Sequence, residues 1–176
     1  MILSGRQTLT RQIVRSLLNA SHQQQPCGID LTLRQISQFT SRGTLDFTNK
    51  NRQSANTTSL PFDPTNHSIT LPQGSYLIDF NETVDIPLDC MGSLFPRSSL
   101  WRSGVGIQAG VVDAGYQGAM GALLEVRNPF GVKLFRDAKV AQIVVEELGE
   151  VVEGYKGVYQ GSSSSQGRNG EGEGGV

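Results

Sequence analysis

Residues 96–118 are PRSSLWRSGVGIQAGVVDAGYQG, where a short apolar run leads into a glycine-containing turn. The pair Val111–Val112 predicts a buried strand. The carboxylate of Asp113 follows directly, and it needs a partner, water or a ligand there, because burying an unpaired charge is costly. Residues 114–118 (AGYQG) predict a hairpin turn whose glycines permit close backbone approach, and Tyr116 adds a flat aromatic wall. We therefore expect a nucleoside-sized pocket at this turn.

An arginine and a serine precede the turn in the segment PRSSL (96–100). A guanidinium group forks onto phosphate oxygens, so Arg97 with Ser98 predicts a phosphate grip beside the candidate base. The same segment can instead cap a helix through a serine, or place Arg97 in a structural salt bridge. These alternatives stay open from the residues alone.

The rest of the chain, from residue 28 to 152, consists of short alternating runs broken by Gly, Pro, Asn and Asp. This pattern is typical of antiparallel β-structure. A sizeable helix is expected only over residues 7–18, where apolar residues recur at helical spacing. Residues 49–64, rich in Asn, Ser and Thr, predict a long exposed loop. The expected strands are 76–80, 83–86, 105–107, 122–126, 132–135 and 140–145.

With 176 residues, the chain is long enough for one domain with a proper core and too short for two ordinary ones. We expect a β domain over residues 1–160. Residues 161–176, GSSSSQGRNGEGEGGV, contain too little apolar surface to offset the entropy of ordering. They predict a flexible Gly/Ser-rich tail.

Composition excludes several function classes. The net charge of −1 lacks the basic footprint of a nucleic-acid-binding protein, although a local arginine can still bind a free nucleotide. No apolar run approaches the roughly 20 residues that span a bilayer, and no secretory signal is visible. We therefore expect a soluble, intracellular protein, cytoplasmic or nuclear, without a nucleic-acid or membrane partner. Cys27 and Cys90 show no CxxC pattern and are expected to be buried thiols.

Four short motifs, in this order along the chain, resemble those of the dUTPase and dCTP deaminase superfamily. The resemblance spans about residues 26–161, and it implies an all-β fold: a distorted antiparallel, jelly-roll-like barrel with a short N-terminal helix. It also implies a homotrimer with three sites at the subunit interfaces. The motifs are GIDLTL (28–33), PRSSL (96–100), AGVVDAGYQG (109–118) and DAKVAQIVV (137–145).

In the dUTPase branch, the resemblance implies hydrolysis of dUTP to dUMP and pyrophosphate with Mg²⁺. Asp113 would be the general base that activates the attacking water, and Tyr116 would pack against the deoxyribose and disfavour a 2′-hydroxyl. Asp30 would orient water in the outer shell of the Mg²⁺ ion, although GIDLTL can also be a simple turn that feeds a strand.

The same resemblance implies a set of phosphate contacts. Arg97, Ser98, Ser99 and neighbouring N–H groups would form the phosphate cradle, and Gln142 would reach toward the phosphates. Gln142 is polar between apolar strand neighbours, so it needs a partner in any case.

In the deaminase branch, PRSSLWR would supply Ser98 and Arg102, and a glutamate would activate the water that attacks cytosine. Glu125 stands at the glutamate position when the alignment is anchored on Asn128. Anchored on Asp113, that position falls on Leu123 instead, because the chain is longer than either branch around AMGAL. Glu125 therefore stays open as a deaminase residue or as a strand residue facing solvent.

The flanking segments favour the dUTPase branch, because they look most like a divergent, archaeal-type subgroup that keeps PRSSLxRSG without being a deaminase. A dCTP deaminase or a bifunctional deaminase and diphosphatase is the alternative. The tail lacks the phenylalanine that usually stacks on the base in dUTPases. Lys156 or Gln160 would instead fold over the triphosphate of a neighbouring subunit, unless this region is simply a strand end followed by disorder.

Overall fold

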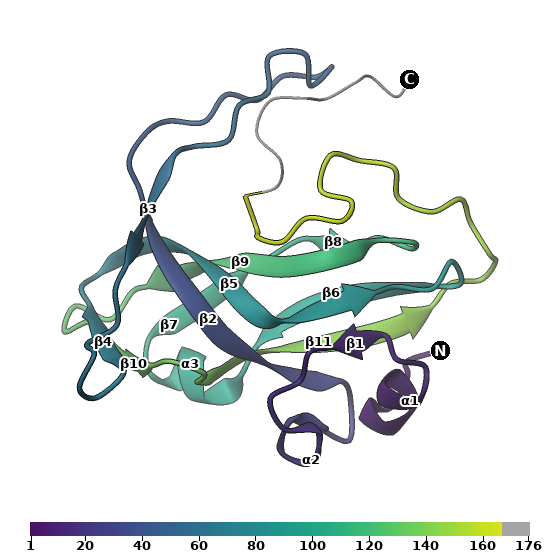
Figure 1. The fold of residues 1–176 in the computed structure, drawn as a ribbon, viewed down its shortest axis with the longest axis horizontal. Coiled ribbons are helices and arrows are strands. Elements are labelled where there is room, and N and C mark those ends of the chain that lie inside the picture. The colour runs from purple at the N-terminus through teal and green to yellow at the C-terminus, as the bar shows by residue number, and fades with distance from the viewer. Residues whose placement is uncertain (167–176) are drawn as a thin grey trace.

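A curled antiparallel sheet dominates the computed structural model, which describes residues 1–166 (Figure 1). Its main strands are β2 (Ile29–Phe39), β5 (Gly74–Asp85), β6 (Cys90–Pro96), β7 (Val105–Gln108), β8 (Val111–Val112), β9 (Gln117–Val126) and β11 (Lys139–Glu147). They are ordered β7-β9-β5-β2-β11-β6-β8, so most neighbours are distant in sequence. The expected all-β fold with little helix is confirmed.

Shorter elements complete the fold. The strand β1 (Val14–Arg15) pairs with β5, and β3 (Thr57–Leu60) pairs with β2. A separate two-stranded sheet joins β4 (Ser68–Leu71) to β10 (Val132–Phe135). The helices in the described residues are α1 (Gly5–Thr10), α2 (Ala20–Gln23) and α3 (Ser98–Arg102). None of these helices is long and apolar enough to cross a membrane.

The core lies inside the curl of the sheet, and the strands alternate toward it. In β9, Ala122, Leu124 and Val126 are buried, whereas Leu123 and Glu125 lie on the opposite face. Two expected strands, 76–80 and 83–86, are the halves of β5, whose pairing with β9 shifts between Asp79 and Thr83. Three of the other expected strands are confirmed with small changes at their ends, as β7, β10 and β11. The expected strand 122–126 is the second half of β9, which begins earlier, at Gln117.

The predicted helix over residues 7–18 is wrong. A capping box between Ser4 and Gln7 starts α1 earlier, and the helix ends at Thr10. Gln12 and Ser16 both adopt positive φ angles, of 54° and 60°, so the helical backbone cannot continue through them. The chain between them extends into β1 instead.

Two further expectations need correction. Residues 49–64 are not all loop, because β3 pairs with β2 within this range. Residues 114–118 do not close a hairpin: β8 pairs with β6, whereas β9 pairs with β5 and β7. The turn therefore connects two different regions of the sheet. Local sequence predicted the turn, but it did not predict which strands pair with β8 and β9 on either side of it.

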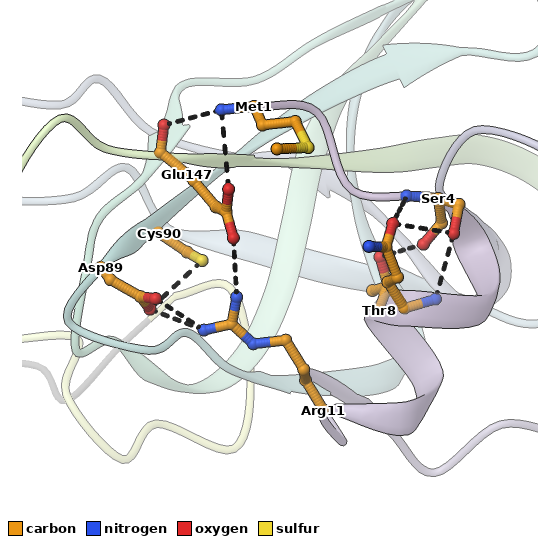
Figure 2. A network of polar contacts seen from close by, with 8 residues as sticks. Met1, Ser4, Thr8, Arg11, Asp89, Cys90 and Glu147 are labelled. Carbon is orange, nitrogen blue, oxygen red and sulfur yellow. Dashed lines mark hydrogen bonds and ion pairs between the residues drawn. The ribbon is translucent and has the colours of Figure 1, made fainter.

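A polar network connects the N-terminus to the start of β6 and the end of β11 (Figure 2). Arg11 forms an ion pair with Asp89 at 2.7 Å and with Glu147 at 3.5 Å. Glu147 also lies 3.9 Å from the α-amino group of Met1. In the same network the Cys90 thiol donates a hydrogen bond to Asp89 at 3.4 Å. The network thus joins the chain start, the turn before β6 and the end of β11.

Cys90 is buried in this network, but Cys27 is exposed, so the expectation of two buried thiols is wrong. Burial and the hydrogen bond to Asp89 raise the pKa of the Cys90 thiol to about 11. The thiolate is the reactive species, so at pH 8 only about one Cys90 in 10³ is reactive. We expect iodoacetamide at pH 8 to label Cys27 alone in the folded protein, and both cysteines in denaturant. Mass spectrometry of the alkylated protein checks this, and equal native labelling at both positions would contradict it.

Candidate active site

A cavity of about 430 Å³ opens beside the turn that follows β8. This volume lies within the range of about 300–1,000 Å³ that is usual for small-molecule sites. Asp113 and Tyr116 line it together, so the predicted pairing of carboxylate and aromatic wall is present in one cavity. The C-terminal segment also lines the cavity, with Tyr155, Tyr159 and residues near Ser164.

The carboxylate of Asp113 is exposed rather than buried. The carboxylate forms no ion pair or hydrogen bond with the described residues of its own chain. The backbone carbonyl oxygen of Asp113 accepts a hydrogen bond from the N–H of Tyr116 at 3.1 Å. The strand residue before it, Val112, is buried and fixes the start of the turn. A carboxylate that is held by its backbone but free at its oxygens is available to accept a proton.

Tyr116 is held rigidly in the cavity wall. Its hydroxyl donates to the carbonyl oxygen of Ala119 at 2.6 Å and lies 3.3 Å from the hydroxyl of Ser162. Its ring packs edge-on against Tyr155, with centroids 5.6 Å apart and planes at 82°. The ring is half-buried, so it is part of the packed structure as well as of the cavity surface.

A second polar cluster surrounds Asp30, whose side chain is only 1% exposed. Arg97 Nε lies 3.2 Å from Asp30 Oδ1, and Lys139 Nζ lies 3.2 Å from Oδ2. Gln25 donates a hydrogen bond to Oδ2 at 3.1 Å. The two cations exceed the carboxylate by one positive charge, and both remain about one-third exposed. This arrangement suits an incoming anion such as a phosphate group.

Sequence reasoning missed Lys139 and Gln25 in this cluster. Lys139 lies in the segment DAKVAQIVV, in which the family resemblance implied a phosphate contact for Gln142 but not for Lys139. Gln142 is opposite Asp30 and Phe95 in the sheet register, and its side-chain amide donates to the carbonyl oxygen of Cys27. It therefore lies near the cluster, with its polar group already bonded.

Ser98 and Ser99 begin the short helix α3, and both are exposed. Arg97 is the N-cap residue, and no side-chain cap bond forms there. The alternative of a serine-capped helix is thus wrong, whereas the alternative of a salt bridge for Arg97 is correct in this structure. The ion pair with Asp30 still leaves Arg97 partly exposed, so it does not exclude phosphate contact.

Within one chain, the polar cluster around Asp30 lies apart from the cavity at Asp113. Val112, next to Asp113, is opposite Gly92 on β6, and Arg97 follows the end of that strand. Five residues of extended chain separate Gly92 from Arg97, which is a distance of about 17 Å. Asp113 and Arg97 of the same chain therefore do not face one phosphate group.

Among the described residues, no hydrogen bond or ion pair joins the three candidate deaminase residues to one another. Glu125 forms an ion pair with Arg127 and accepts a hydrogen bond from Gln108 at 2.9 Å. The guanidinium of Arg102 lies over the ring of Trp101, 4.4 Å from its centroid. Ser98 is at the other end of α3.

The expected tail residues contact their own chain. Lys156 pairs with Glu153 at 3.3 Å, and Gln160 forms two hydrogen bonds with the turn at residues 115–117. Residues 161–166, the start of the expected flexible tail, lie against β9 and β5; for example, the N–H of Ser165 donates to Asp79 at 2.7 Å. The rest of that tail, residues 167–176, lies outside the described residues.

The curled antiparallel sheet and the cavity at the aspartate-bearing turn define a β domain of the dUTPase type. The chain belongs to the dCTP deaminase-like family, whose profile matches residues 2–148. The resemblance seen in the sequence motifs is thereby confirmed.

Two archaeal proteins and one bacterial crystal structure are similar to this chain. A probable deoxyuridine 5′-triphosphate nucleotidohydrolase of Methanosarcina mazei is 38% identical over 154 residues, covering 87% of this chain and 90% of the relative. The deoxyuridine 5′-triphosphate nucleotidohydrolase of Methanocaldococcus jannaschii is 34% identical, covering 78% and 86%. A crystal structure of 2′-deoxycytidine 5′-triphosphate deaminase from Agrobacterium tumefaciens has a TM-score of 0.61 at 22% identity, covering 84% of this chain and 49% of that one. This last likeness concerns the fold alone.

Proposed function

We propose that the protein is a dUTP diphosphatase, which hydrolyses dUTP to dUMP and pyrophosphate. The observation that carries the proposal is the cavity in which the carboxylate of Asp113, unpaired by any residue from 1 to 166, lies beside the fixed ring of Tyr116. The archaeal relatives named as nucleotidohydrolases of deoxyuridine triphosphate support this substrate.

In the proposed reaction, Asp113 accepts a proton from the water that attacks the α-phosphorus. The new bond joins the water oxygen to this phosphorus, the bond to the bridging oxygen breaks, and pyrophosphate leaves. Arg97 and Lys139 bind the phosphate chain and balance its growing negative charge. Ser98 and Ser99 lie at the exposed start of α3, where they can add hydrogen bonds to the same phosphates.

The proposed site is shared between subunits of a homotrimer. Within one chain, Arg97 lies about 17 Å from Gly92, the residue opposite Val112, so Asp113 and Arg97 are too far apart for both to touch one α-phosphate. A neighbouring subunit can bring its own Arg97 cluster to the cavity at Asp113, because a head-to-tail contact in a closed ring joins two different surfaces. Each site would then use the base of one subunit and the cations of another.

Mg²⁺ belongs to the proposal as an ion that arrives with the triphosphate. The residues around Asp30 do not fit a resident Mg²⁺ ion: the carboxylate is buried, and two cations already lie against it. No group of three or more metal-ligating side chains occurs in the described residues either. Asp30 instead orients Arg97 and Lys139, while Mg²⁺ relies on the substrate's phosphates and water.

The substrate preference of the proposed enzyme rests on the turn. The ring of Tyr116 would lie against the deoxyribose and exclude a 2′-hydroxyl, and backbone groups of the turn would recognise the uracil edge. Such a substrate implies an intracellular setting, cytoplasmic or nuclear, where nucleoside triphosphates occur. No nucleic-acid or membrane partner is part of the proposal.

A product assay tests the proposal. The purified protein is incubated separately with dUTP, dCTP and UTP in the presence of Mg²⁺, and pyrophosphate and ammonia are measured in each sample. We expect pyrophosphate from dUTP, little from UTP, and no ammonia from dCTP. Ammonia from dCTP without pyrophosphate from dUTP would replace the proposal with a deaminase.

A dCTP deaminase, or a bifunctional deaminase and diphosphatase, is the second candidate, because PRSSLWR and the family profile both allow it. The engagement of Glu125 by Arg127 and Gln108 favours a structural role for this residue. We therefore expect Glu125→Gln to keep dUTP hydrolysis within about tenfold of the wild-type rate, since no proton transfer is lost. Pyrophosphate release by both proteins, measured side by side, checks this, and a loss beyond a hundredfold would assign chemistry to Glu125.

A further inference from the structure

The C-terminal segment of residues 154–162 runs beside the turn of residues 113–118. Figure 1 shows this yellow-green segment passing over the ends of β8 and β9. The two backbones approach closely, because both carry glycine at the contact: a Cβ atom on Gly115 would lie 2.6 Å from the Cα atom of Gly154. Such an approach excludes any larger residue there without a shift of the backbone.

Gln160 bonds the turn from both ends of its side-chain amide. Its oxygen accepts the N–H of Gln117 at 3.0 Å, and its nitrogen donates to the carbonyl oxygen of Gly115 at 2.9 Å. The next residue continues the pattern, since the N–H of Gly161 donates to the carbonyl oxygen of Gln117 at 2.8 Å. The side chain of Gln160 thus takes the place of a strand backbone beside the turn.

The sheet leaves an edge for this contact. The strand β7 pairs with β9 only from Leu123 to Val126, so the first residues of β9 have no neighbour on that side among the strands that the structure describes. Backbone N–H and C=O groups at an edge need partners. The C-terminal segment provides them, and the carbonyl oxygen of Ser162 accepts the N–H of Ala119 at 2.8 Å.

We propose that Gln160 is a positioning residue that holds the turn of residues 113–118 in the shape required to distinguish deoxyribose from ribose. The inference rests on the proposed function and deepens it. Gln160 bonds residues on both sides of Tyr116, whose hydroxyl is fixed in turn by Ala119. It acts through the turn, which differs from the phosphate contact that the family resemblance implied for it.

The test uses Gln160→Met, which keeps the length of the side chain and removes both hydrogen bonds. Because two bonds to the turn are lost, we expect amide hydrogen exchange in residues 114–119 of the nucleotide-free protein to rise about tenfold. The kcat/KM ratio of dUTP to UTP should fall about tenfold, with kcat for dUTP lowered as Asp113 moves. Gln160→Glu keeps the acceptor for the N–H of Gln117. Its amide exchange and its kcat/KM ratio should therefore lie between those of the wild type and those of Gln160→Met. Gln73→Met, in the exposed turn between β4 and β5, is the matched control.

A phosphate contact predicts a different result. It would raise KM for dUTP and UTP equally, with the ratio and the amide exchange as in wild type, and this outcome overturns the proposal. The exchange measurement needs no substrate. It therefore tests the positioning role of Gln160 even if the wild-type protein releases no pyrophosphate from dUTP. That failure would contradict the proposed function, whereas unchanged exchange in Gln160→Met would contradict the positioning role itself.

Discussion

Asp113→Asn is expected to lower the turnover of dUTP by about 10²–10⁴-fold, the usual contribution of a general base. The amide has nearly the same volume as the carboxylate but does not accept the proton from water. Since the carboxylate forms no bond with the described residues of its own chain, folding should not depend on it. The measurement is pyrophosphate release at saturating dUTP, with thermal unfolding recorded for both proteins.

The matched control is Glu150→Gln, an exposed acid in the loop after β11. It removes one carboxylate outside the cavity and should leave the rate unchanged. Binding of a non-hydrolysable dUTP analogue to Asp113→Asn should persist within about tenfold, because the base acts mainly in the transition state. Near-wild-type pyrophosphate release by Asp113→Asn would remove Asp113 from the mechanism.

Arg97→Ala is expected to lower kcat/KM for dUTP by about 10²–10³-fold, because a preorganised cation at the phosphates is lost. It also leaves the buried Asp30 with one cation instead of two, which should reduce the free energy of unfolding by about 1–3 kcal/mol. Arg97→Lys separates the two effects: its charge restores the stability, but a lysine does not provide the guanidinium fork, so activity stays low.

Chemical denaturation and steady-state kinetics of the Arg97 variants check these values. Arg6→Ala, an exposed arginine on α1, serves as the control for loss of one positive charge. If Arg97→Ala lost stability but kept wild-type kcat/KM, Arg97 would be a structural partner of Asp30 alone.

The sheet could be predicted because its strands contain runs that alternate apolar and polar residues, as in residues 78–81 (IDFN) of β5, and alternation is a local signal. The first helix could not, since the left-handed backbone at Gln12 and Ser16 interrupts a pattern that otherwise has helical spacing. Strand pairing could not be predicted either. Val112 and Gln117 lie on either side of one turn, yet their strands pair with different partners.

The candidate site divides in the same way. Asp113 and Tyr116 were predictable together, because they lie three residues apart on one turn. The contact of Asp30 with Lys139 joins β2 to β11, more than a hundred residues later, so no local pattern reveals it. The bonds from Gln160 to the turn also depend on tertiary contact, which only the folded chain supplies.

Co-expression of Asp113→Asn and Arg97→Ala chains, each with its own affinity tag, tests most directly whether each site combines two subunits. Oligomers that carry both tags are purified, and their pyrophosphate release from dUTP is compared with that of each variant alone. In every closed ring of three subunits that carries both chains, about one third of the sites, one in each ring, pairs an intact Asp113 with an intact Arg97. We expect activity to recover toward that fraction of the wild-type rate. Mixed oligomers as inactive as either variant would show that both residues must come from one chain, which contradicts the shared site.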